Sequence, residues 1–178
     1  MSECDFHVKP IVTMALNTGM RKGEILSLKW ANVDLSHGFI LLEITKNGER
    51  REIPINSTLR AALQGLVRRL DVPYVFHDAK TAERYQDVKK GFSAACRGAG
   101  INDFHFHDLR HTFASHLVMA GQDLTTVKEL LGHKTLTMTL RYAHLGPSHK
   151  VKAVDVLDTI LNGPSTLHLV DNLEVPKC

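Results

Sequence analysis

Several features are scarce in this sequence of 178 residues, and each shortage argues against a class of protein. The cysteines, Cys4, Cys96 and Cys178, are odd in number and lack the C-x-x-C spacing of a zinc or redox site, which favours reduced thiols in a cytosolic protein. Aromatic residues make up only 6% of the chain, so an aromatic-rich platform for carbohydrate or RNA is not indicated. No apolar stretch approaches the ~20 residues of a transmembrane helix, and residues 1–20 lack a signal-peptide apolar region. We therefore expect no membrane role.

Two motifs that would indicate metal- or nucleotide-dependent chemistry are also missing. The sequence has neither a Walker motif nor a cluster of carboxylates spaced to hold two metal ions. What is present is balanced: 22 Lys and Arg against 19 Asp and Glu give a formal net charge of +3, which permits an anionic partner without requiring one. With 43% hydrophobic residues the chain is long enough to bury one sizeable core.

Hydrophobic periodicity predicts a mainly α protein with a small antiparallel β-sheet, an α+β fold. The sheet is expected within residues 39–55, where β-branched residues flank Asn47-Gly48, a strong hairpin signal. Lys46 then lies at the hairpin tip. Ser57 is expected to cap a helix whose apolar positions continue to Leu70. Further helices are predicted in residues 10–28, interrupted at Thr18-Gly19, and over residues 87–99, 108–120, 123–131, 135–145 and 151–161.

Several polar residues are candidates for function, although each has an ordinary structural explanation. An arginine at a helix start, such as Arg21, is usually a surface charge. His107 and Arg110 share one helical face, which would equally suit solvent. A tyrosine in a late helix, such as Tyr142, is usually half-buried packing. Taken singly, each has a chance of roughly one in ten of being functional, given the false-positive rate of short motifs.

The order of the motifs along the chain is far more specific than any one of them. They are T-G-M-R-K-G-E at 18–24, T-K-N-G at 45–48, H-D-L-R-H-T-F-A-S at 107–115, L-L-G-H at 130–133 and R-Y at 141–142. With them the sequence resembles the tyrosine recombinase or phage integrase family, from about residue 10 to residue 145. The catalytic domain of that family carries Arg, Lys, His-x-x-Arg, His or Trp, and Tyr in this order. All six positions are filled here, by Arg21, Lys46, His107, Arg110, His133 and Tyr142.

The resemblance implies the catalytic-domain fold of DNA breaking-rejoining enzymes and a covalent 3′-phosphotyrosine intermediate. Attack on a phosphodiester concentrates negative charge on the non-bridging oxygens. Arg21 and Arg110 can meet that charge with planar, permanently charged donors, and His133 is expected to add another. Glu24, three residues after Arg21 on the same helical face, is expected to orient that arginine rather than to react.

Tyr142 is the expected nucleophile, and its reference pKa near 10 means that the hydroxyl needs help to lose a proton at neutral pH. We expect His107 to give that help, and the resemblance implies that Lys46 protonates the leaving 5′-oxygen. These side chains replace the electrostatic role of a metal ion, so no cofactor and no metal are expected. Because Tyr142 is expected to swing onto the clamped phosphate with its helix, the free protein can hold it away from the site.

The resemblance also suggests an organisation and partners. Residues 1–148 are assigned to the catalytic domain and residues 149–178 to a C-terminal helix and tail, which packs either on its own core or on a neighbouring subunit. The N-terminal core-binding domain of the family is not found, so we expect a fragment or a minimal member with weak, salt-sensitive and poorly site-specific DNA binding. The expected partner is double-stranded DNA, bound by a tetramer on paired sites. The free protein is expected to be a monomer or weak oligomer in a bacterial or phage-infected cytoplasm, associated with the nucleoid when acting.

The residues leave three alternatives to a recombinase that integrates, excises or resolves DNA. A zinc enzyme is suggested by the i, i+4 spacing of His107 and His111, but an H-E-x-x-H helix needs glutamate where Asp108 stands. A catalytically silent DNA-binding module is suggested by the helix-turn-helix-like segment 108–131. A type IB topoisomerase would use the same reactive residues to relax supercoils. The flanking motifs H-D-L-R-H-T-F-A-S and L-L-G-H favour a recombinase.

Overall fold

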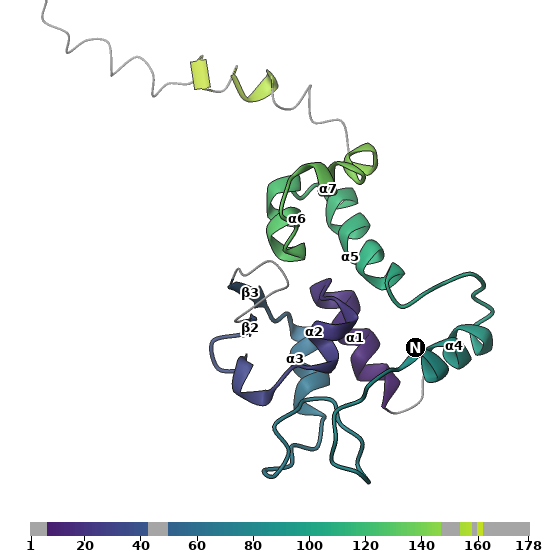
Figure 1. Ribbon diagram of the computed structural model, residues 1–178. Helices are drawn as coiled ribbons and strands as arrows, with labels where there is room; N and C mark the ends of the chain where they lie inside the picture. The colour runs from purple at the N-terminus through teal and green to yellow at the C-terminus, as the bar shows by residue number, and fades with distance from the viewer. Residues whose placement is uncertain (1–6, 43–49, 147–153, 158–159, 162–178) are drawn as a thin grey trace, which may run out of the picture. The chain divides into compact units, whose positions relative to one another are not determined.

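The computed structural model describes residues 7–42, 50–146, 154–157 and 160–161. The chain divides into two units, residues 1–146 and residues 147–178. The described part of the first unit contains seven α-helices, two short 3₁₀ segments and one three-stranded sheet (Figure 1). The predicted fold class, mainly α with a small antiparallel sheet, is therefore confirmed.

Two short helices open the first unit. Helix α1 spans Val8–Thr18 and helix α2 spans Lys22–Leu26. Between them Gly19 adopts a left-handed conformation, with φ 61°, and its N–H closes α1 by donating to the carbonyl of Ala15. Glycine adopts this conformation at little cost, so the predicted interruption at Thr18-Gly19 is confirmed.

The sheet follows a 3₁₀ segment, η1 (Trp30–Asn32), and contains β1 (Val33–Asp34), β2 (Phe39–Leu42) and β3 (Arg51–Pro54) in that order. Strands β2 and β3 pair antiparallel, with Ile40 opposite Ile53 and Leu42 opposite Arg51, as the hairpin prediction requires. The predicted turn at Asn47-Gly48, and Lys46 with it, lies outside the described residues.

Helix α3 corrects two details of the prediction. It spans Ser57–Gln64, and its N-cap is Asn56, whose Oδ1 accepts the N–H of Leu59 at 2.9 Å; Ser57 is the first helical residue. The helix also ends before Leu70. Val67 and Leu70 are 78% and 99% exposed, so they bury no apolar surface that would stabilise a longer helix.

The helices predicted between residues 87 and 131 agree closely with the structure, whereas the helix predicted over 135–145 does not. Helices α4 (Lys89–Gly98), α5 (Asp108–Met119) and α6 (Leu124–Leu131) confirm three predictions to within two residues. The helix predicted over 135–145 is divided into α7 (Thr137–Leu140) and η2 (Ala143–Leu145). Tyr142 lies between them, where its N–H donates to the carbonyl of Thr139, an i→i+3 bond that tightens the chain.

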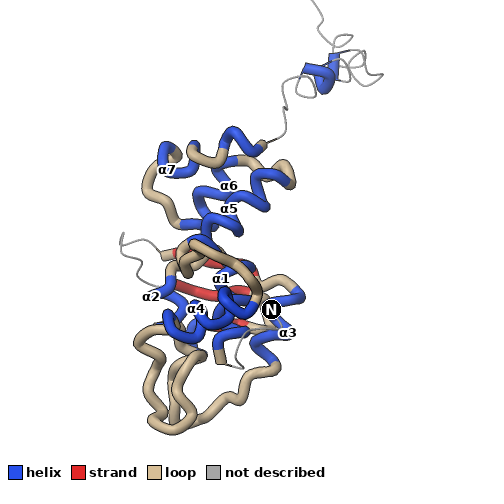
Figure 2. The backbone as a smooth tube through the Cα atoms, turned by 90° about the vertical axis from the view of Figure 1, so that its right-hand side faces the viewer, coloured by secondary structure: helices blue, strands red, loops and turns tan. Residues whose placement is uncertain are grey.

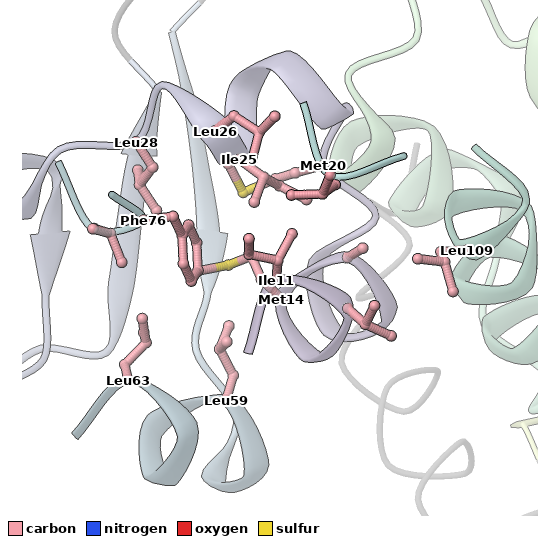
Figure 3. Packing of buried hydrophobic residues seen from close by; sticks show 14 of the residues in the cluster. Ile11, Met14, Met20, Ile25, Leu26, Leu28, Leu59, Leu63, Phe76 and Leu109 are labelled. Atoms are coloured by element: carbon pink, nitrogen blue, oxygen red, sulfur yellow. The ribbon is translucent and has the colours of Figure 1, made fainter. Parts of the chain in front are cut away.

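Two apolar clusters build the first unit. In the larger one, Ile11 and Met14 of α1 lie between Ile25 of α2 and Leu59 of α3 (Figure 3). The smaller cluster joins α5 and α6 and contains Ala114, Val118, Val127, Leu131 and Tyr142. Figure 2 shows α5, α6 and α7 grouped together, next to the part of the unit that holds the sheet. Helix α5 serves both clusters, because Leu109 belongs to the first and Ala114 to the second.

In the second unit, residues 154–157 and 160–161 are helical, which agrees with the predicted helix over 151–161 where the structure describes it. The apolar side chains of this segment are all exposed: Val154, Val156, Leu157, Ile160 and Leu161.

Candidate active site

Arg21 is held at the start of α2 by the helix that it precedes. Its backbone N–H donates to Oε2 of Glu24 at 2.8 Å, and its Nη1 donates to Oε1 of the same carboxylate, also at 2.8 Å. The carboxylate thus fixes both the helix start and the guanidinium. The Arg21 side chain is 29% exposed, so part of it remains available to a ligand. This geometry agrees with the orienting role predicted for Glu24.

A third arginine, Arg51, joins this pair and was not singled out from the sequence. Its Nη2 donates to Oε2 of Glu24 at 3.0 Å, and its side chain is only 7% exposed. Burial raises the pKa of Glu24, but the N–H of Arg21 and the charges of Arg51 and Arg21 outweigh it, so the pKa lies below its ordinary value. Glu24 is therefore a carboxylate shared by two guanidinium groups.

Arg110 is the most deeply placed charge of the candidate site. It is 4% exposed, and its guanidinium spans two carbonyls, with Nη1 donating to Gly19 and Nη2 donating to Leu131, each at 2.6 Å. Burial, followed by the charges of Arg21 and Arg51, lowers its pKa to about 10. It remains charged at neutral pH. Glu24 forms ion pairs with Arg21 and Arg51, whereas Arg110 donates to two carbonyls, so these three arginines and one carboxylate carry excess positive charge.

His133 follows the C-terminal end of α6. Its Nδ1 lies 2.9 Å from Oγ1 of Thr139, whose residue is fully buried. Burial lowers the pKa of His133 to about 4, and Arg110 and Arg21 contribute next. The ring is therefore neutral at pH 7 and keeps one ring N–H that can donate a hydrogen bond.

Tyr142 is 5% exposed, and its hydroxyl lies 2.5 Å from Nδ1 of His111. His107 lies one turn earlier, with its ring edge-on to that of His111 at a centroid distance of 4.9 Å. The motif predicts this contact for His107, whereas the structure places His111 there. Burial raises the pKa of Tyr142 more strongly than Arg141 and Arg110 lower it, so the hydroxyl stays protonated at neutral pH.

One pocket of about 320 Å³ collects these side chains. Five of the six predicted site residues line it, although they come from separate parts of the chain. Lys46 lies outside the described residues. Tyr142 lines the same pocket as Arg21 and Arg110, so in this structure it lies at the site and not away from it. The lining residues are Arg21, His107, Arg110, His111, His133, Thr137, Met138, Arg141 and Tyr142.

Six residues at or beside the pocket were not proposed from the sequence as part of this site: Arg51, His111, Thr137, Met138, Thr139 and Arg141. Arg51 could have been found from strand alternation. In the sequence R-E-I-P of β3, Arg51 is two residues before Ile53 and therefore on the same, buried face of the strand. His111 has helical spacing from His107, but its contact with Tyr142 joins residues 31 positions apart. Arg141 belongs to the R-Y motif but was given no role, and Thr137, Met138 and Thr139 have no comparable pattern in the sequence.

No group of three or more His, Cys, Asp and Glu side chains is placed to hold a metal ion in the part of the chain that the structure describes. Within that same part, no helix is both long and apolar enough to cross a membrane.

Arg21, the buried Arg110 and histidines with lowered pKa values line one pocket beside the Tyr142 hydroxyl, which makes the pocket suited to an anionic group. Comparison with known proteins gives the family. Residues 2–149 match the model of the Phage integrase family, so the chain belongs to that family.

Individual relatives agree with this membership. The integrase of Salmonella phage P22 is 32% identical over 174 residues, which cover 90% of this chain and 45% of the relative. A shufflon-specific DNA recombinase of Escherichia coli is 34% identical over 146 residues, which cover 82% of this chain and 36% of the relative. This chain therefore spans less than half the length of either. The solved catalytic domain of bacteriophage HP1 integrase superposes with a TM-score of 0.67 and 30% identity, covering 98% of this chain and 92% of that one.

Proposed function

We propose that this chain is the catalytic domain of a site-specific DNA recombinase that cuts and rejoins strands through a 3′-phosphotyrosine. The observation that carries the proposal is the pocket in which Arg21, Arg110 and His133 lie together with Tyr142. Five of the six residues predicted from the sequence line this pocket, and the sixth, Lys46, lies outside the described residues. Residues 1–148 are assigned to the catalytic domain, and residues 149–178 to the C-terminal segment.

The arginines are proposed to clamp the scissile phosphate. Arg110 is preorganised because two carbonyls hold its guanidinium, and Arg21 because Glu24 holds its own. A preorganised donor costs no reorganisation when charge develops, and removing one typically lowers the rate by about 10²–10³. The excess positive charge around Glu24 is stabilised once a phosphate binds. His133 adds a neutral ring N–H.

Tyr142 is proposed to attack phosphorus, which releases a 5′-hydroxyl and leaves the 3′-phosphate on the phenol oxygen. Lys46 is proposed to protonate the leaving oxygen, as the resemblance implies, and His107 to act at the phosphate beside Arg110. The phosphotyrosine conserves the phosphodiester bond energy, so religation needs no nucleotide. We propose that the mechanism uses neither a metal ion nor another cofactor.

Double-stranded DNA is the proposed partner, and two relatives, named an integrase and a DNA recombinase, support it. We further propose that the protein acts as a tetramer on paired DNA sites and is a monomer or weak oligomer when free. The place of action would be the cytoplasm of a bacterium or phage-infected cell, at the nucleoid.

A covalent trapping experiment tests this function. The chain is incubated with a library of labelled duplexes that carry randomised sequence and a nick that lets the cleaved strand diffuse away, so that the intermediate accumulates. Wild type is expected to give a labelled band that survives denaturation, and Tyr142→Phe is expected to give none. The matched control is Tyr85→Phe, which removes a hydroxyl elsewhere and should react normally. An adduct of equal yield in Tyr142→Phe would refute the proposal.

A further inference from the structure

We propose that His111 takes the proton from Tyr142 during cleavage and returns it during rejoining. This inference rests on the proposed function, because it deepens the role of the nucleophile. The observation behind it is the 2.5 Å distance between Nδ1 of His111 and the Tyr142 hydroxyl oxygen, the atom that would attack phosphorus. A proton acceptor must lie within hydrogen-bond reach of the proton that it takes, and His111 meets that condition.

The direction of this hydrogen bond follows from the charge state of the ring. Burial lowers the pKa of His111, and the neighbouring His107, Arg141 and Arg110 lower it further, against the opposing charge of Asp108. A neutral ring has one nitrogen without hydrogen. The Tyr142 hydroxyl is protonated at neutral pH because burial raises its pKa. The hydroxyl therefore donates to Nδ1, and the ring hydrogen lies on Nε2.

His107 is less well placed for the same task. Its ring contacts the ring of His111 edge-on, at an interplanar angle of 87°, whereas His111 itself lies within hydrogen-bond distance of the hydroxyl. His107 is exposed at the start of α5 and is three residues before Arg110, on the same helical face. We therefore assign the two histidines different roles. His107 would contact the bound phosphate beside Arg110, and His111 would accept the proton of Tyr142.

In cleavage, one proton and one phosphorus–oxygen bond change places at Tyr142. The O–H bond of Tyr142 breaks and its proton moves to Nδ1 of His111, which becomes an imidazolium. The phenol oxygen forms a bond to phosphorus while the bond from phosphorus to the 5′-oxygen breaks, and the leaving oxygen takes a proton from the general acid. In rejoining, the 5′-hydroxyl attacks phosphorus and gives its proton back to the group that acted as general acid. The bond from phosphorus to the Tyr142 oxygen breaks, and His111 returns its proton to the phenol oxygen.

Two substitutions separate proton transfer from positioning. His111→Ala removes the ring, whereas His111→Gln keeps a hydrogen-bonding side chain that cannot carry a proton at neutral pH. The readout is the single-turnover rate of covalent adduct formation on the nicked duplexes. Because general base catalysis contributes about 10²–10⁴, both variants are expected to lose at least 100-fold. The matched control is His116→Ala, an exposed histidine on the same helix, which should stay within about threefold of wild type.

The pH profile adds a readout that a structural role would not change. Catalysis by His111 requires the neutral ring, so the wild-type rate should fall as the pH drops through the pKa of His111. The groups that face it are His107, Asp108 and Arg110 on α5, and Arg141 and Tyr142 on the segment between α7 and η2. In His111→Ala this dependence should disappear, and the rate should instead rise about tenfold per pH unit until the phenol itself ionises.

The outcomes separate this inference from the function on which it rests. If wild type forms the adduct and either variant reacts within threefold of it, proton transfer by His111 is wrong while the recombinase function stands. If wild type forms no adduct on any duplex, both proposals fail. Long-range ¹H–¹⁵N NMR of the free wild-type protein provides a measurement that does not depend on how the variants fold. It should show Nδ1 of His111 without hydrogen, and a protonated Nδ1 at neutral pH would overturn the inference.

Discussion

Replacing Glu24 by glutamine removes the carboxylate that Arg21 and Arg51 share. Arg51 would then be a cation whose side chain is only 7% exposed and whose other guanidinium nitrogens, Nε and Nη1, have no hydrogen-bond partner in the structure. Removing one partner of a buried ion pair typically costs about 3–5 kcal/mol. Because glutamine keeps one acceptor oxygen, we expect a loss near the lower limit, about 3 kcal/mol. At this size of domain, that corresponds to a fall in Tm of roughly 6–12 °C.

Urea unfolding followed by the fluorescence of Trp30, the single tryptophan, measures this loss directly. The matched control is Glu52→Gln, at an exposed position on β3 next to Arg51, which should change the free energy of unfolding by less than about 0.5 kcal/mol. The pKa of Glu24 is lowered in the folded protein, so its contribution is present above the unfolded pKa and is lost as the pH falls through the folded value. Acid sensitivity should therefore decrease in Glu24→Gln. Equal stability of the two variants would refute the reasoning.

Three further predictions follow from the same geometry. Arg110→Lys should lower the rate of adduct formation by at least about 100-fold, because one ammonium cannot span the two carbonyls that the guanidinium binds; a rate within threefold of wild type would contradict this. Gly132→Ala should lower the Tm, because the new Cβ would clash with Nη1 of Arg51 at a φ of 62°, whereas Gly23→Ala has open space and should not. The ring of His133 should titrate near pH 4 in the free protein by NMR and at higher pH when inorganic phosphate is bound, because the anion favours the charged ring; an unchanged midpoint would count against phosphate binding at this site.

The sequence carried most of the information about the elements and the order of the reactive residues. Strand alternation predicted the pairing of β2 with β3, and helix-ending glycines placed the ends of α1 and α6 correctly. These features could be predicted because a hairpin and a helix end are determined by residues that are close together in the sequence. The helix predicted as far as Leu70 failed for a different reason: its apolar pattern continues, but no core lies against it.

The contacts inside the site were much harder to predict. Arg51 and Glu24 are 27 residues apart, and the partner of a buried charge depends on how strand and helix pack. Likewise, helical spacing places His107 and His111 on one face, but only the position of Tyr142 shows which of them contacts the hydroxyl. Motif order therefore predicted which residues gather, whereas tertiary packing determined their contacts.

The central claim is that Tyr142 forms the covalent bond to DNA. The most direct measurement is to digest the trapped adduct with protease and nuclease and to locate the remaining nucleotide by tandem mass spectrometry. The proposed mechanism predicts a 3′-phosphonucleotide on the peptide that contains Tyr142. A nucleotide attached to Tyr74, Tyr85 or a serine, or one joined through its 5′-phosphate, would contradict it.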